Sequence, residues 1–265
     1  MNNTKRYTVF KSPRKKLIAA GCSYTEHYLT TNGTRLMPPN PNVNFDFTRW
    51  PEHLSNMLDM ECVNVGSTGA GNDQILARTL DATLKEKDIG LVVIMWSEWR
   101  RMGFQGSPNS QQWTSVTPYN VKEWEIFFME KQNWFHATRN TLRTFMYAEK
   151  LLGDTPYMFV QGTKELWFGQ YSYAENRRRL RVLAANEILT SPYLDYIEKN
   201  IGDKFVGWPI MHEIGGYNMD DILDKEDPER LKYRISEADT HPNDDGHKLI
   251  ADFLYDKYRE IYNED

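Results

Sequence analysis

Short apolar runs, each followed by a polar or glycine-rich turn, constrain the fold of this chain more than any other feature. The clearest is LVVIMW at 91–96, which is apolar on both faces and therefore typical of a central strand in a parallel sheet. Similar runs predict strands at 16–21, 61–65, 156–161 and 205–208.

Helical patterns alternate with these runs. Trp50 and Pro51 begin one helix, with proline in its first turn, and Asn72 or Asp73 is expected to cap the next, whose apolar residues recur at helical spacing up to position 83. Further helices are predicted at 121–152 (as two helices), 177–189, 192–200 and 248–262. Strands that alternate with helices in this way predict an α/β fold with a doubly wound sheet, whose ligands bind at the carboxyl ends of the strands.

The composition fits one folded domain. The chain has 265 residues, of which 40% are hydrophobic and 13% aromatic, which supplies enough apolar surface for a core and excludes a mainly disordered chain. Residues 1–15 carry several Lys and Arg and are predicted to form a basic arm, and 16–265 are predicted to form a single domain. Stretches rich in Pro, Asn, Gly and Gln at 30–49 and 103–119 are expected to be loop insertions.

Several classes of protein are excluded or disfavoured. The run at 91–96 is far shorter than the roughly 20 apolar residues that cross a bilayer, so no membrane segment is expected. A net charge of −5 gives no general reason to expect a nucleic-acid partner. Two cysteines and no apolar leader predict a cytoplasmic or otherwise non-exported protein, with association with a virion left open. The sequence does not specify an oligomeric state.

Polar clusters follow the first three predicted strands, and a fourth precedes the last helix. Ser23 lies in the turn after the first strand, where a hydroxyl can be exposed at the edge of the sheet. A serine in that position needs a base within hydrogen-bonding reach to become a nucleophile, and His241 in the last cluster is the candidate.

Three blocks of sequence carry a family resemblance. GCSYT at 21–25, NVGSTG at 64–69 and DTHPN at 239–243 resemble, in this order, the motifs of the SGNH (GDSL-type) hydrolase family. The resemblance implies a flavodoxin-like three-layer α/β/α sandwich with a central parallel sheet, and the activity of an esterase, lipase or carbohydrate deacetylase. The GCS form of the first block is familiar among SGNH-like proteins of phages and bacteria.

Carried over by position, the resemblance implies that Ser23 is the nucleophile and His241 the base. The backbone N–H groups of Ser23 and Gly69 would form the oxyanion hole. The family places an Asp three residues before the His, whereas here Asp239 stands two before it. Residues i and i+2 of an extended segment point the same way, so Asp239 is predicted to orient His241. Glu237, Asp244 or a backbone carbonyl are the alternatives.

The third block departs most from the family pattern. It lacks the usual Asn and reads WSEWRR at 96–101, where Ser97 is the candidate for the missing oxyanion donor and the charge of Glu98 would oppose an oxyanion. Arg100, Glu26 and Trp96 are predicted to contact the substrate.

Two other residues have competing interpretations. Cys22 could be a thiol nucleophile, but a cysteine between a strand and a turn is more often a small buried apolar residue. The spacing of His241 and His247 is unlike that of known metal pairs, which favours a role for His247 at a helix start. No metal or other cofactor is predicted.

Two functions remain open on the sequence. The first is a serine esterase or deacetylase that cleaves a small acyl ester, such as an O-acetyl group on a carbohydrate. The alternative is a non-catalytic SGNH-like module that binds a glycan or an acidic ligand in the same pocket. A separation of Ser23 Oγ and His241 Nε2 well beyond about 3.5 Å would favour the binding module.

Overall fold

The computed structural model describes residues 14–26, 47–106, 113–116, 134–164, 174–236 and 239–262. Nearly all of the predicted basic arm, most of the loop at 30–49, and the first predicted helix within 121–152 lie outside the described residues. Glu237, an alternative partner for His241, also lies outside them.

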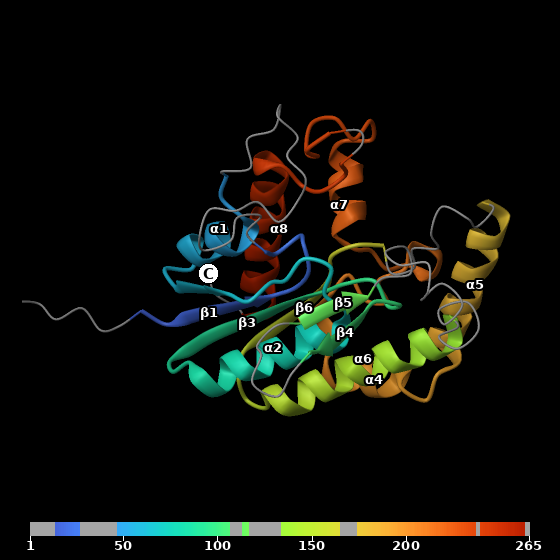
Figure 1. Ribbon diagram of the computed structural model, residues 1–265, viewed down its shortest axis with the longest axis horizontal. Coiled ribbons are helices and arrows are strands. Elements are labelled where there is room, and N and C mark those ends of the chain that lie inside the picture. The colour runs from blue at the N-terminus through green and yellow to red at the C-terminus, as the bar shows by residue number, and fades with distance from the viewer. Residues whose placement is uncertain are drawn as a thin grey trace, which may run out of the picture.

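A parallel sheet of five strands forms the centre of the molecule (Figure 1). Its spatial order is β2-β1-β3-β6-β7, which in sequence order is 2-1-3-4-5, the flavodoxin-like order. All five predicted strands are therefore confirmed, although the last is shorter than expected. The strands are β1 (Lys16–Ala20), β2 (Glu61–Asn64), β3 (Ile89–Trp96), β6 (Tyr157–Gln161) and β7 (Phe205–Val206).

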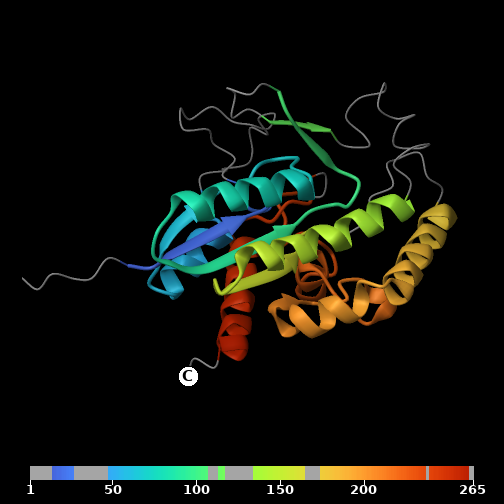
Figure 2. The same ribbon diagram turned by 90° about the horizontal axis from the view of Figure 1, so that it is seen from below.

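Helices cover both faces of the sheet, which confirms the three-layer sandwich (Figures 1 and 2). One face is covered by α1 (Trp50–Met57), α7 (Met219–Glu226) and α8 (Asp244–Tyr262). The other is covered by α2 (Asn72–Lys85), α4 (Trp134–Leu152), α5 (Ala174–Thr190) and α6 (Leu194–Asn200). Within the described residues, no helix combines the length and apolar character that a membrane crossing needs.

Strand β3 shows how the sequence pattern builds two cores. Successive side chains of a strand point to opposite faces, so Met95 packs with α8 and α1 while Trp96 packs with α4. The Trp96 ring lies 5.1 Å from that of Phe145 and 5.4 Å from that of Phe159, and Trp96 has no exposed surface. The prediction that Trp96 contacts the substrate is therefore wrong, because its side chain faces the core.

The position of Trp96 leads to a stability prediction. We expect Trp96→Ala to lower the free energy of unfolding by about 3–5 kcal/mol, since it empties a large, fully buried volume between sheet and helix. Urea unfolding followed by circular dichroism measures this loss, with Tyr147→Ala as the control because Tyr147 is 57% exposed on α4. Equal effects of the two variants would contradict the packing described here.

Two elements differ from the sequence prediction. The loop expected at 103–119 contains part of an antiparallel pair, β4 (Met102–Gln105) with β5 (Trp113–Val116). Helix α7 was not predicted, although Asn218 and Asp221 form a capping box at its start, with Asn218 Oδ1 3.1 Å from Asp221 N. Short 3₁₀ turns at Gly202–Lys204 and His212–Ile214 complete the described elements.

Candidate active site

The turn after β1 presents Ser23 at the carboxyl edge of the sheet. Thr25 N and Glu26 N both donate to the carbonyl of Cys22, at 2.9 and 3.0 Å, and this closes the turn around Ser23. Glycine is required at position 21, because a Cβ there would lie 2.1 Å from Thr25 Oγ1. Cys22 itself has no exposed surface, which supports its interpretation as a small buried residue.

The structure brings Ser23, His241 and Asp239 together as a hydrogen-bonded chain. Ser23 Oγ lies 2.8 Å from His241 Nε2, although the two residues are 218 positions apart in the sequence. His241 Nδ1 lies 2.6 Å from Asp239 Oδ1. Since Nδ1 faces a carboxylate, it is assigned the proton, and Nε2 is then able to accept the proton of the Ser23 hydroxyl.

Asp239 reaches the imidazole despite the shortened spacing. Its Oδ1 also accepts the backbone N–H of His241 at 3.2 Å, which fixes the carboxylate beside the ring. Burial would raise the pKa of Asp239, but the hydrogen bond and the charge of His241 outweigh it and lower the pKa below its ordinary value. Asp239 is therefore an anion at neutral pH, as an orienting carboxylate must be.

Hydrogen bonds to residues 235 and 236 hold the segment that carries the imidazole. Ser236 N donates to the carbonyl of Asp239 at 3.0 Å, and Asp239 N donates to Ser236 Oγ at 3.0 Å. Ile235 N donates to the carbonyl of His241 at 2.9 Å. These contacts fix His241 before α8 begins.

The loop after β2, which carries Gly69, is hydrogen-bonded to the turn after β1. Ser67 N donates to the carbonyl of Gly21 at 2.9 Å, so the loops after β1 and β2 are joined directly. Gly69 has a φ of +75°, a conformation that favours glycine. Within the described part of the chain, the backbone N–H groups of Ser23 and Gly69 have no protein acceptor. Their predicted role in an oxyanion hole stays a prediction.

Glu26 has a structural partner rather than a free carboxylate. Its Oε2 accepts the backbone N–H of Thr68 in a short hydrogen bond. The contact links the turn after β1 to the loop that carries Gly69. Glu26 is therefore placed to hold this loop, and its predicted contact with the substrate stays a prediction.

Ser97 at the end of β3 does not complete an oxyanion hole as predicted. It has no exposed surface, its N–H donates to Asn72 Oδ1 at 2.8 Å, and its Oγ accepts from Arg101 Nη1 at 3.1 Å. Because its backbone N–H and its hydroxyl oxygen are both hydrogen-bonded inside the protein, Ser97 has no access to a substrate. Glu98 is paired with Arg101, with Oε2 2.9 Å from Nε, so the negative charge that would oppose an oxyanion is balanced.

Asn72 differs from the sequence prediction. The N-cap of α2 is Gly71, and the Asn72 side chain instead bonds the backbone of Ser97 after the third strand. The predicted capping role of Asn72 or Asp73 is wrong, because Asp73 lies inside the helix and its carboxylate accepts from Gln74 N and Gly103 N. No sequence signal pairs Asn72 with a backbone group 25 residues away.

The remaining residues predicted from the sequence are Arg100 and His247. Arg100 is partly buried after β3, and this burial lowers the pKa of its guanidinium from its ordinary value. Its predicted contact with the substrate stays a prediction. His247 is fully buried in the first turn of α8, where Nε2 lies 3.0 Å from Arg49 Nη1 and Nδ1 lies 3.4 Å from Trp50 N at the start of α1. Among the described residues, no three His, Cys, Asp or Glu side chains gather as a metal site requires.

The course of the chain is similar to that of several solved structures. One is a member of the lipolytic protein G-D-S-L family from Veillonella parvula, with 14% identity, a TM-score of 0.44, and coverage of 94% of this chain and 99% of that one. A catalytic mutant of an acetylxylan esterase from Geobacillus stearothermophilus has 12% identity and a TM-score of 0.47, over 93% and 95% of the two chains. A psychrotrophic esterase from Pseudoalteromonas sp. has 13% identity and a TM-score of 0.47, over 94% and 100%.

Neither the models of protein families nor the curated proteins yield a match to this sequence. The solved structures resemble this chain only in the course of the backbone. The chemistry has to be argued from the side chains of the site.

Proposed function

We propose that this protein is a serine ester hydrolase of the SGNH type, an esterase or deacetylase acting on a small acyl ester such as an O-acetyl group on a carbohydrate. The observation that carries the proposal is the chain from Ser23 Oγ to His241 Nε2, at 2.8 Å, and from His241 Nδ1 to Asp239 Oδ1, at 2.6 Å. A nucleophile, a base and a group that orients the base occur in the order that acyl transfer needs.

In the first half of the reaction, Ser23 Oγ attacks the acyl carbon while His241 Nε2 takes the hydroxyl proton. The C–O bond of the ester then breaks, and the leaving alcohol receives that proton from His241. The acyl group remains bound to Ser23. Asp239 stabilises the imidazolium that forms between these two proton transfers, because its anion lies against Nδ1.

The second half of the reaction repeats these steps with water. His241 takes a proton from the water as its oxygen attacks the acyl carbon, and returns a proton to Ser23 Oγ as the carboxylic acid leaves. In both halves a tetrahedral oxyanion develops. The N–H groups of Ser23 and Gly69, which have no acceptor among the described residues, are the donors we assign to it.

The alternative of a binding module is less well supported. A wide separation of Ser23 Oγ and His241 Nε2 would have favoured it, whereas the two atoms lie 2.8 Å apart, within hydrogen-bonding range. Ser23 is only 5% exposed, and its hydroxyl oxygen lies against the imidazole. Ligand binding alone gives no physical reason for a carboxylate, an imidazole and a hydroxyl to form a hydrogen-bonded chain in this order.

Two measurements test the proposed function. Nitrophenyl esters of acetate, butyrate and octanoate, together with an O-acetylated monosaccharide, report hydrolysis and acyl-chain preference. A serine-directed phosphonate reports a nucleophilic hydroxyl, through the mass of the modified peptide. We expect turnover with the acetyl esters and an adduct on Ser23; the absence of both would leave the binding module as the better explanation.

The backbone conformation of Gly69 gives a prediction for the oxyanion hole. We expect Gly69→Ala to lower kcat by about 10²-fold or more, because a residue with a Cβ resists a φ of +75° and turns its N–H away from the oxyanion. The added Cβ would also lie 3.3 Å from that of Ser115. Steady-state kinetics on an acetyl ester measures the loss.

A matched control separates this effect from backbone strain in general. Gly153, which follows α4, has a φ of +55°, and a Cβ there would meet no atom within 4 Å. Gly153→Ala should therefore cost stability in thermal unfolding while leaving kcat unchanged. If the two variants had the same kcat, the assignment of the Gly69 N–H to the oxyanion would be wrong.

A further inference from the structure

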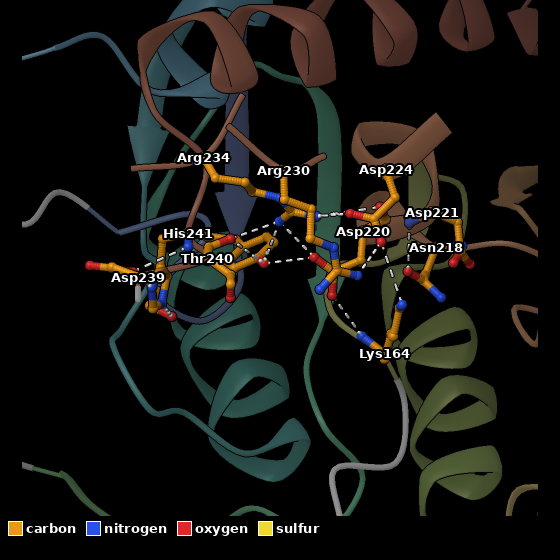
Figure 3. Close-up of polar contacts among 12 residues, drawn as sticks. Lys164, Asn218, Asp220, Asp221, Asp224, Arg230, Arg234, Asp239, Thr240 and His241 are labelled. Atoms are coloured by element: carbon orange, nitrogen blue, oxygen red, sulfur yellow. Dashed lines mark hydrogen bonds and ion pairs between the residues drawn. The ribbon is translucent and has the colours of Figure 1, made fainter. Parts of the chain in front are cut away.

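A buried arginine lies between the two halves of the proposed catalytic site. Arg234 is 2% exposed and comes just before the segment that carries Asp239 and His241 (Figure 3). Its guanidinium is the centre of a group of side chains and one carbonyl that we name the Arg234 cluster: Tyr24, Asp220, Asp224, Arg234 and the carbonyl of Thr240.

Arg234 makes a separate contact with each member of the cluster. Nη1 lies 2.8 Å from Asp220 Oδ1, 2.8 Å from the carbonyl oxygen of Thr240 and 3.0 Å from Tyr24 Oη. Nη2 lies 2.8 Å from Asp224 Oδ1. The planar fork of a guanidinium can reach two carboxylates, a hydroxyl and a carbonyl at once, which the single ammonium of lysine cannot reproduce.

The cluster joins the residue next to the nucleophile to the residue next to the base. Tyr24 follows Ser23 in the turn after β1, and its hydroxyl donates to Asp220 at 2.7 Å while it accepts from Arg234. Thr240 precedes His241, and its carbonyl accepts from Arg234. The Tyr24 ring also meets the imidazole of His241 edge to face, with the ring centres 5.4 Å apart.

The charges of the cluster fit this arrangement. Burial alone would lower the pKa of Arg234, but Tyr24, Asp220 and Asp224 outweigh it and raise the pKa, so the guanidinium stays charged. Burial also raises the pKa of Tyr24 well above its ordinary value, so its hydroxyl keeps the proton that it donates to Asp220. A buried ion group of this kind contributes little net stability but defines one geometry when all its partners are present.

We propose that Arg234 is a positioning residue for the catalytic dyad: through Tyr24 and the carbonyl of Thr240 it fixes the distance between Ser23 Oγ and His241 Nε2. Its kinetic consequence rests on the proposed esterase function, whereas its effect on the geometry of His241 does not. Arg234 touches no reacting atom, and it acts through the two residues that flank the dyad.

The experiment compares wild type with Arg234→Lys and Tyr24→Phe. Arg234→Lys keeps the charge but loses the fork, and Tyr24→Phe keeps the ring against His241 but loses the hydroxyl. Arg139→Lys is the matched control, because Arg139 pairs with the buried Glu187 at 2.5 Å between α4 and α5, away from Ser23. Tyr24→Phe removes a single oxygen atom, so it keeps the test meaningful if Arg234→Lys does not fold.

Two readouts are taken on each folded variant. The first is the downfield proton NMR signal of the His241 Nδ1–H held by Asp239, assigned by its loss in His241→Gln. The second is kinetic: kcat and KM on an acetyl ester, and the rate of phosphonate inactivation at Ser23. We expect the signal to broaden or vanish in both cluster variants, and kcat and the inactivation rate to fall about 10- to 100-fold, with KM within about twofold of wild type.

The outcomes separate this inference from the proposed function. If wild type neither hydrolyses esters nor reacts with phosphonate, but the cluster variants lose the His241 signal that Arg139→Lys keeps, positioning stands and the esterase function fails. If Arg234→Lys and Tyr24→Phe keep both the signal and the wild-type inactivation rate, the positioning role is wrong. A loss of signal and kcat of equal size in Arg139→Lys would overturn it as well, because the effect would then be a general one.

Discussion

We expect Ser23→Ala to abolish ester hydrolysis, lowering kcat by about 10⁴- to 10⁶-fold. The Ser23 hydroxyl is the only group that the proposed mechanism allows to form the acyl intermediate, and alanine leaves His241 without a proton to accept. The backbone N–H of position 23 survives the substitution, so the residual rate reflects the oxyanion hole acting on water attack. Stopped assays at high enzyme concentration, with an acetyl ester, measure a loss of this size.

The control for this variant is another buried serine. Ser55 is 2% exposed in α1 and donates to the carbonyl of Glu52 at 3.0 Å, so Ser55→Ala removes a comparable buried hydroxyl that bonds within its own helix. We expect Ser55→Ala to keep kcat and to react with the phosphonate, and Ser23→Ala to do neither. Phosphonate adduct formation in Ser23→Ala would place the nucleophile elsewhere and contradict the proposed mechanism.

The fold was largely predictable because parallel strands are buried on both faces. Runs such as LVVIMW at 91–96 leave few structures other than a central strand, and β3 covers 89–96. The β4–β5 pair was missed because its stretch is rich in Gly, Pro and Gln, and α7 because it is short and carries three aspartates. In both, contacts with the rest of the fold outweigh weak local preference.

The residues of the site were also predicted in part. Ser23, His241 and Asp239 were identified because a nucleophile and its base lie in short blocks with a characteristic order. Trp96 was misassigned although the alternation of side chains along β3 places it on the same face as Ile94, which packs in the core. Position near the end of a strand predicts nearness to the sheet edge, but β3 packs against a core on each face of the sheet, so the Trp96 side chain is buried.

The Arg234 cluster could not be predicted, because its contacts join segments far apart in the sequence. Tyr24 and Arg234 are 210 residues apart, and Tyr24 and Asp220 are 196 apart. An arginine in a polar stretch normally indicates a solvated surface, and only the folded arrangement shows that two partly buried aspartates pair with the buried Arg234. Residues that support a site are therefore harder to find than those that perform its chemistry.

We expect Asp239→Asn to lower kcat by about 10⁴-fold with little change in KM. The amide has nearly the shape of the carboxylate, but it cannot stabilise the imidazolium, and its NH₂ group favours the tautomer with the proton on Nε2. His241 would then face Ser23 Oγ with a donor instead of an acceptor. Glu187→Gln is the matched control, since Glu187 is a buried, paired carboxylate on α5 outside the site.

The pKa of Asp239 adds a second, independent readout. Because folding lowers this pKa, the Asp239 carboxylate adds stability that is present above the unfolded-state pKa of about 3.9 and is lost as the pH falls through the lower folded-state value. The free energy of unfolding of Asp239→Asn should therefore lie below that of wild type at neutral pH, and the difference should shrink in acid. A difference that does not depend on pH, together with an unchanged kcat, would show that Asp239 neither pairs with His241 as an anion nor orients it.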